Sequence, residues 1–396
     1  MNDGRSELPR PPRRIPVDAG TLTQLEAPSR PVHPSEPQPR QPWIYGRFLA
    51  GFLVLLVIVA GGAGAGWFVR QQSLRIDTAA ALEAAGPAVV RVLATTCGSS
   101  GEASGVLIDN GRILTAASAV ETPTSIVVMT PDGRIRRANL LGTSADGVAV
   151  LQSIGFDGEP LQLPATDPDP KAERALIGYT AAGKRVVNGI GSAAEPEALS
   201  QFMNPAKLGG AVVDRSGDLV GLVTGDTVQA STVVSLTKLR EYVAQAPSGL
   251  TVGTPGACPE SRGPQSPIAP VLQVAGTPLA KEVQRLLANY LTLQNRHDFG
   301  KVRAFYSPRF AGALTEEQDR NKHLTSYFFS PRLTDLAPDG SSARMAYNVM
   351  YAPTAAGAGG QNCSRLDTTF YLVRSRGQLV IDRTVKASDA VACDTD

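Results

Sequence analysis

A serine hydroxyl becomes a nucleophile only when a neighbouring base can take its proton, so the bases of the chain decide what its serines can do. The chain has three histidines, none of them between residues 87 and 251: His33, His297 and His323. Within that segment Ser118 could pair with Lys184 or Lys207, provided that the lysine is desolvated beside the hydroxyl. Nothing in the sequence around either lysine indicates such burial, so we expect no serine–lysine catalysis.

Strand and turn patterns indicate the framework that would carry these groups. Runs such as AVVRVLATTC (88–97) are rich in β-branched residues, and glycine-bearing turns at 110–111 and 132–133 divide such runs into hairpins. We therefore predict an all-β domain over residues 87–251, built as a double β-barrel. The alanine-rich residues 71–86 before it are expected to form a short helical stalk.

Three blocks of this domain resemble the trypsin-like serine peptidases of the HtrA type, especially their membrane-anchored forms in actinobacteria. They are VVRVLATTCGSSGEASGVLIDNGRILTAASAV, LLGTSADGVAVLQS and LGGAVVDRSGDLVGLVTG, in the order and spacing of the family. The resemblance implies a trypsin-like fold, and it places the family's histidine, aspartate and serine at Ser118, Gly147 and Leu208. It also places the glycine of the oxyanion loop at Ala206.

These replacements predict a degenerate catalytic triad. A serine hydroxyl cannot act as the base near neutral pH, glycine has no side chain, and leucine offers no nucleophile. Asp146 lies one residue before the aspartate position, on the opposite face of a strand, so it supplies the carboxylate only if the alignment slips by one. We therefore predict a pseudoprotease, which is not an enzyme. The alternative is an unconventional serine peptidase.

A trypsin-like fold without a triad can still hold an extended peptide against a strand edge, because that pairing uses backbone groups. We therefore predict a protein- or peptide-binding or scaffold module, and we expect its partner to be an envelope protein or peptide. The simpler alternative is a domain that only spaces its neighbours.

An apolar run precedes the β-rich domain. Phe48–Val69 contains no charged or strongly polar side chain, and with a rise of about 1.5 Å per residue it is long enough to cross a bilayer core. We predict one transmembrane helix over residues 47–70, with a buried core helix as the alternative.

Residues 1–46 are rich in proline and arginine, which indicates a disordered cytoplasmic tail and an extracytoplasmic remainder. Gly62 and Gly66 have the spacing that lets two such helices pair in a homodimer.

The cysteines agree with this orientation. Cys97, Cys258, Cys363 and Cys393 all follow the predicted span. An even set outside the cytoplasm is normally paired, and counting alone leaves three connectivities. The family resemblance implies Cys97–Cys258, which staples the end of the trypsin-like domain to its start, and it leaves Cys363–Cys393 for the C-terminal part.

A proline- and glycine-rich linker (252–272) leads to a C-terminal part with another pattern. Helical spacing comes first in residues 273–396 and strands follow, so we predict an α+β domain. The stretch LLANYLTLQNRHDFGKVRAFYSPRF resembles the cone-shaped nuclear transport factor 2-like (SnoaL-like) domains, and this resemblance implies a pocket between helices and sheet. Five residues are candidates to line the pocket: Tyr290, His297, Asp298, Tyr306 and Tyr347.

Two interpretations of His297 and Asp298 stay open. They could act as an acid–base pair, or they could form a polar cap at a helix end. A small-ligand sensor that works through this domain is a further alternative for the function of the chain.

Composition and motifs limit the remaining functions. The formal net charge of +2 over 396 residues, with no basic stripe in the folded part, gives no electrostatic reason to expect nucleic acid as a partner. The sequence has no phosphate-binding loop and no dinucleotide fingerprint, and its cysteines are too scattered for zinc. We expect no cofactor and no metal.

Overall fold

The computed structural model covers most of the chain after the apolar run. It describes residues 75–98, 101–109, 111–153, 155–156, 158–192, 199, 201–246, 248–251 and 258–395, with scattered positions between 52 and 74. Among these residues no helix is both long and apolar enough to cross a membrane. The predicted tail, most of the predicted span and Gly66 lie outside the described residues.

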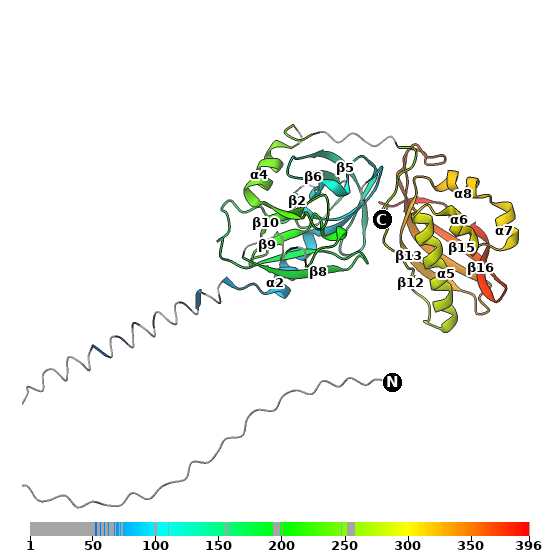
Figure 1. Ribbon diagram of the computed structural model, residues 1–396, viewed down its shortest axis with the longest axis horizontal. Helices are drawn as coiled ribbons and strands as arrows, with labels where there is room; N and C mark the ends of the chain where they lie inside the picture. Colours follow the sequence, from blue (N-terminus) through cyan, green and yellow to red (C-terminus); the bar gives the residue numbers. More distant parts are fainter. Residues whose placement is uncertain are drawn as a thin grey trace, which may run out of the picture. The chain divides into compact units, whose positions relative to one another are not determined.

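The first group of strands closes into a barrel (Figure 1). Its strands are β1 (Val89–Thr96), β2 (Glu102–Asp109), β3 (Arg112–Ala116), β4 (Pro123–Met129), β5 (Ile135–Thr143) and β6 (Val148–Ser153). They pair in the order β1-β2-β3-β6-β5-β4, and antiparallel pairing of β4 with β1 completes the circle. Gly111 and Gly133 have φ of 79° and 86°, the left-handed conformation that the predicted hairpin turns need.

The second group of strands forms a sheet. Its strands are β7 (Arg174–Tyr179), β8 (Arg185–Gly191), β9 (Ala211–Val213), β10 (Leu219–Thr224) and β11 (Thr232–Ser235), in the order β11-β10-β9-β7-β8. The prediction of two barrels is therefore only half right for the described residues: one barrel is closed, and the other sheet has five strands whose outer members do not pair. The short β9, three residues long, limits how far this sheet can curl round on itself.

Two helices cover parts of the trypsin-like domain. Helix α4 (Leu236–Gln245) is amphipathic and packs on β10. Helix α2 (Thr78–Ala85), capped by the side chain of Asp77, lies in the predicted stalk and buries its alanines against β7 and β8.

The C-terminal part is helical first and β-rich afterwards, as the pattern predicted. Its helices are α5 (Pro278–Asn295), α6 (Phe299–Val302), α7 (Pro308–Ala313) and α8 (Glu316–His323). Its strands are β12 (Val271–Leu272), β13 (Tyr327–Leu336), β14 (Ser342–Met350), β15 (Cys363–Ser375), β16 (Gln378–Lys386) and β17 (Val391–Ala392). Sheet order is β12-β13-β14-β15-β16, with β17 against β15, and the core lies between this sheet and the helices. Strand β12 belongs to this sheet although its residues fall in the predicted linker.

Both disulfides form as the resemblance implied. Cys97 pairs with Cys258 and Cys363 with Cys393, with Cα–Cα distances of 5.8 Å and 5.5 Å. The described residues of the predicted linker also include Arg262, which forms a β-bridge with Thr96 next to the first disulfide.

Candidate functional site

Ser118, at the position of the family's histidine, lies in a short 3-10 turn, η2 (Ala117–Ala119), directly after β3. Its hydroxyl is half-buried and donates a hydrogen bond to the carbonyl oxygen of Gly225, 2.7 Å away. The partner of Ser118 is therefore a backbone acceptor and not a side-chain base.

Gly147, at the aspartate position, sits in the turn before β6 with φ of 75°. Its carbonyl oxygen accepts the N–H of Ala117 at 2.8 Å, so this turn still lies against the Ser118 turn. The carboxylate of the neighbouring Asp146 accepts a hydrogen bond from the hydroxyl of Tyr242 on α4. The carboxylate that the sequence analysis considered as a substitute for the aspartate is thus engaged with helix α4.

Leu208, which the resemblance places at the nucleophile position, is a core residue with an exposed fraction of 3 %. It belongs to an apolar cluster drawn from β3, β7, β8, β9 and β10 and from the segment before η3 (Pro205–Lys207). The buried members are Ala116, Leu176, Ile190, Leu199, Leu208, Val212, Val220 and Val223, and Phe202, Met203 and Val233 pack against them. Apolar side chains therefore surround the point at which a nucleophile would have to emerge.

By the same resemblance, the two backbone N–H groups that would form an oxyanion hole belong to Ala206 and Leu208. The N–H of Ala206 donates to the side-chain oxygen of Asn204 at 3.0 Å, and the N–H of Leu208 donates to the carbonyl oxygen of Pro205 at 3.2 Å. Asn204 is an N-cap and Pro205 is the first residue of the 3-10 turn, which is the residue order that favours such a turn. Both donors are consequently used inside their own loop.

Lys207 is more deeply buried than the sequence suggested, with an exposed fraction of 6 %. Desolvation by burial lowers the pKa of its ammonium group. The Nζ atom donates to the side-chain oxygen of Asn188 at 2.8 Å and to the carbonyl oxygen of Phe202. Lys184 is exposed in a turn. Neither lysine forms a hydrogen bond with a serine hydroxyl in the described residues, which is the contact that a serine–lysine pair requires.

A cavity of about 720 Å³ lies between the helices and the sheet of the C-terminal domain. Three of the predicted residues line it, Tyr290, Tyr306 and Tyr347, together with apolar side chains such as Phe328 and Phe370. A volume of this size suits a drug-sized organic ligand.

The cavity also contains a charged network that the sequence analysis missed. Asp319, with an exposed fraction of 1 %, accepts hydrogen bonds from the hydroxyl of Tyr306 at 2.8 Å and from the amide nitrogen of Gln294 at 3.3 Å. Nδ1 of His323 lies 3.0 Å from Oδ1 of Asp319, the oxygen that Gln294 contacts, whereas Tyr306 donates to Oδ2. Burial alone would raise the pKa of Asp319, but the hydrogen bonds of His323, Tyr306 and Gln294 together lower it. Burial, with Tyr290 and Asp319 nearby, raises the pKa of Tyr306.

In this network the carboxylate of Asp319 orients the imidazole of His323 at the wall of the cavity. The available sequence signal was the spacing of Asp319 and His323, four residues apart on one helix face. It was hidden because α8 is otherwise a strongly polar helix that looks solvent-exposed.

His297 and Asp298 do not line this cavity. His297 is buried with φ of 55°, and its ring nitrogens contact a carboxylate oxygen of Glu260 at 3.2 Å and the carbonyl oxygen of Ser326 at 3.3 Å. Asp298 caps α6 and forms an ion pair with Lys301. Asp298 therefore has the capping role, because the helix start needs the acceptor that it supplies, whereas His297 is a buried residue with contacts of its own.

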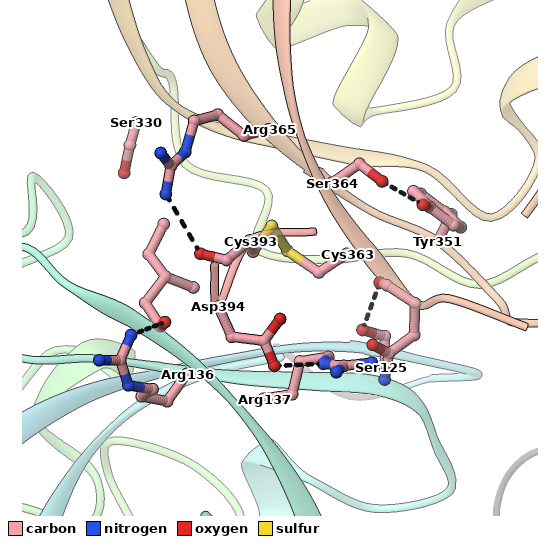
Figure 2. Close-up of a disulfide and its surroundings, with 12 residues drawn as sticks. Ser125, Arg136, Arg137, Ser330, Tyr351, Cys363, Ser364, Arg365, Cys393 and Asp394 are labelled. Atoms are coloured by element: carbon pink, nitrogen blue, oxygen red, sulfur yellow. Dashed lines mark hydrogen bonds and ion pairs between the residues drawn. A yellow bond between two sulfur atoms is a disulfide. The ribbon is translucent and has the colours of Figure 1, made fainter. Parts of the chain in front are cut away.

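The two domains share a buried apolar cluster, which we call the shared core. From the barrel it takes Leu93, Val127 and Ile135, and from the C-terminal domain Tyr327, Phe329, Met350, Cys363 and Cys393. Figure 2 shows the Cys363–Cys393 disulfide within this contact. Around it, Ser125 donates to the carbonyl oxygen of Asn362 at 2.9 Å and Arg137 forms an ion pair with Asp394 at 2.6 Å (Figure 2).

No group of three or more His, Cys, Asp or Glu side chains is placed to hold a metal ion in the part of the chain that the structure describes.

Comparison with known proteins identifies the β-rich part of the chain. Residues 103–222 match the family model of the trypsin-like peptidase domain. No curated protein matches the chain.

Solved structures of HtrA-type and related proteases are similar to part of the chain. A variant of the HtrA-type protease AlgW with tripeptide is 23% identical (TM-score 0.38), with 44% of this chain and 65% of that chain covered. The serine endoprotease from Yersinia pestis is 25% identical (TM-score 0.37), with 44% and 68% covered. The Rv3671c protease of M. tuberculosis, in an inactive form, is 17% identical (TM-score 0.35), with 42% and 91% covered. The chain thus spans slightly less than two thirds of the AlgW chain.

Proposed function

We propose that the trypsin-like domain is a pseudoprotease, which serves as a non-enzymatic scaffold and protein-binding module for the C-terminal domain. The observation that carries this proposal is the packing of Leu208. A side chain that is 3 % exposed and surrounded by apolar neighbours fills the place where a serine nucleophile would meet its substrate.

Three further contacts support the loss of proteolysis. Ser118 has a carbonyl oxygen as its partner, so no base is placed to take its proton. The N–H groups of Ala206 and Leu208 donate within their loop, so they are not available to a developing oxyanion. Each of these losses alone lowers the rate of acyl transfer by orders of magnitude.

The shared core supports a scaffold rather than a passive spacer. A spacer would be joined to its neighbour by an exposed linker, whereas here large side chains such as Leu93 and Phe329 are fully buried between the two domains. The filled site at Leu208 also argues against peptide binding in the former catalytic cleft. Partner binding would use another face of the domain.

The location that we propose is the extracytoplasmic side of a cell membrane, with the predicted helix 47–70 as the anchor. Two disulfides support an oxidising compartment, since such bonds seldom persist in the cytosol.

A direct test combines turnover with chemical labelling of the full chain in detergent micelles. We expect no cleavage of casein and no labelling by a fluorophosphonate, while an active trypsin-like peptidase in the same detergent is labelled. Covalent labelling of Ser118, lost in Ser118→Ala, would contradict the proposal and revive the unconventional peptidase.

The scaffold role has its own test in a pair of phenylalanine variants. Phe329→Ala opens the shared core and should loosen hydrogen-exchange protection in both domains, because both contribute to that core. Phe370→Ala opens the separate core of the C-terminal domain and should leave barrel strands protected. Equal patterns in the two variants would count against a scaffold.

The cavity favours a second function, the binding of a small organic ligand by the C-terminal domain. Its buried Asp319 and the partly exposed His323 supply polar contacts to a ligand, and apolar walls supply the rest of the contact. Thermal-shift screening of the full chain against Tyr306→Phe and Asp319→Asn variants tests it. A ligand whose effect is unchanged in both variants would not be bound in this cavity.

A further inference from the structure

A second cavity, of about 410 Å³, opens beside the shared core. It is lined by the turn between β4 and β5 on the barrel side and by β13, β14 and β15 on the other. Its polar side chains include Arg134, Arg136, Ser330, Arg332, Asn348 and Arg365. Figure 2 shows three of them, Arg136, Ser330 and Arg365, around the Cys363–Cys393 disulfide.

The lining carries an excess of positive charge. Four arginines face one carboxylate, that of Asp132, and this carboxylate already forms an ion pair with Arg134 at 2.8 Å. A hydrogen bond from the hydroxyl of Thr130, with those from Arg134, lowers the pKa of Asp132, so the carboxylate stays ionised. The guanidinium group of Arg332 has no hydrogen bond or ion pair within the described part of the chain, whereas Arg136 donates to the carbonyl oxygens of Gly155 and Ile135, and Arg365 to those of Cys393 and Thr395. The positive charges of guanidinium groups that line one cavity attract an anion into it.

A buried amide completes the polar lining. Asn348 has an exposed fraction of 3 %, and its side-chain oxygen has no hydrogen-bond partner in the described residues. A buried amide without a partner is costly, and it calls for a ligand or water that supplies one. Because the two ends of an amide can exchange places, Asn348 can offer either a donor or an acceptor to a ligand.

The backbone of β13 is bent at the same place. The pairing of β13 with β14 shifts register between Phe329 and Arg332, and Ser330 within this bulge has φ of 50°. A non-glycine residue in the left-handed region is uncommon and costs free energy. At this bulge the Ser330 hydroxyl has only a weak contact, 3.8 Å from the sulfur of Met129. Ser330 lines the cavity, so its hydroxyl is available for a stronger hydrogen bond to a ligand.

From these features we propose that this cavity binds a phosphate group, either as inorganic phosphate or as the phosphate of a small phosphorylated molecule. A tetrahedral dianion presents oxygens to guanidinium groups that come from several directions. A planar carboxylate instead pairs with the two parallel N–H donors of one guanidinium group. Ser330 and Asn348 supply neutral hydrogen bonds to the same group or to a hydroxyl beside it.

The position of the cavity gives phosphate a structural effect. Arg134 and Arg136 belong to the barrel side, and Arg332 and Arg365 belong to the C-terminal sheet, so one anion can bridge the two domains. A ligand that binds the folded, docked state stabilises that state by mass action. Phosphate therefore strengthens the contact between the scaffold and the domain that it carries.

Calorimetric titration of the full chain in a maltoside detergent, which contains no phosphate, tests this proposal. Inorganic phosphate and glucose 6-phosphate are titrated separately against chloride at matched ionic strength. We expect saturable heat with phosphate and none with chloride, and tighter binding of glucose 6-phosphate identifies a phosphorylated small molecule as the ligand. Loss of a charge-assisted contact should weaken binding about tenfold or more in Arg332→Gln and in Arg365→Gln.

Arg285→Gln is the matched control, because Arg285 is an exposed arginine of α5 that does not line the cavity. It should bind phosphate like the unaltered chain. Asn348→Leu guards against misfolding as an explanation, since it removes a buried amide that has no partner and should raise the melting temperature while binding is weakened. Absence of any phosphate-specific heat, or equal affinity in Arg285→Gln and Arg365→Gln, would overturn the proposal. Neither result bears on the lack of proteolysis.

Discussion

The side-chain oxygen of Asn204 accepts the backbone N–H of Ala206 at 3.0 Å, and this bond closes the loop that would otherwise face a scissile carbonyl. In the pseudoprotease that we propose, the loss of activity therefore involves the backbone as well as the three side chains of the triad. Restoring those side chains leaves the loop as it is.

We predict that the triple variant Ser118→His, Gly147→Asp, Leu208→Ser is not labelled by a fluorophosphonate. The reason is that the N–H groups of Ala206 and Leu208 still donate inside η3, so the oxyanion lacks donors that are worth about 3 kcal/mol each. The measurement is the labelling rate at neutral pH, with an active peptidase as the positive control.

Adding Asn204→Ala and Ala206→Gly to the triple variant frees one donor and gives the loop the glycine that the family resemblance places there. Labelling should then become detectable. Rapid labelling of the triple variant without these two changes would show that the loop opens readily and that the side chains alone were limiting.

Leu208→Ala should lower the free energy of unfolding by about 3 kcal/mol, the range for a buried leucine whose site cannot collapse. Urea unfolding of the full chain measures the effect. Val385→Ala, at a β16 side chain that is 44% exposed, should cost less than about 0.5 kcal/mol and serves as the control. A cost for Leu208→Ala below about 1 kcal/mol would mean that the former cleft is loosely filled.

The surroundings of Leu208 show how much of the candidate site the sequence could predict. The resemblance placed Leu208 at the nucleophile position because three blocks of strands have the family's order and spacing. It could not predict that Phe202 and Met203 pack against the apolar cluster that contains Leu208, since they come from an irregular segment with no hydrophobic period. The occupied N–H of Ala206 was equally hidden, although the Asn204-Pro205 pair is a recognisable start of a 3-10 turn.

Outside the site, predictions succeeded where a local pattern determines the structure. The glycine turns of the barrel and the helix-then-strand order of the C-terminal domain follow from residues close in sequence. The shared core does not, because Leu93 and Phe329 are far apart in the chain and both have the pattern of ordinary strand residues. His297 and Asp298 were adjacent and chemically suggestive, yet burial and capping decided their roles.

Removing the Cys363–Cys393 disulfide by alanine at both positions should destabilise the full chain by about 4 kcal/mol. The bond closes a loop with a sequence separation of 30, and chain entropy alone gives this order of magnitude. Alanine at Cys97 and Cys258, with a separation of 161, should cost about 5 kcal/mol. Denaturant midpoints compare the two variants. If the first variant unfolded in a transition separate from the barrel, the coupling through the shared core would be disproved.

His297 makes the stability of the chain depend on pH in a window that begins near 6.5. Burial lowers the pKa of this imidazole, and its contacts with Glu260 and the carbonyl of Ser326 only partly oppose that shift. An unfolded histidine titrates near 6.5, so between its folded pKa and about 6.5 the unfolded chain binds more protons, and stability falls as the pH is lowered through this range. The hydrogen bond of Arg262 is the main cause that lowers the pKa of Glu260. The contribution of Glu260 to the free energy of unfolding is therefore lost only at more acidic pH, below about 4.5.

We expect the free energy of unfolding to decline from pH 7 to pH 5. We expect His297→Asn, which tolerates the φ of 55°, to remove this slope. A slope that persists unchanged in the variant would assign it to other groups.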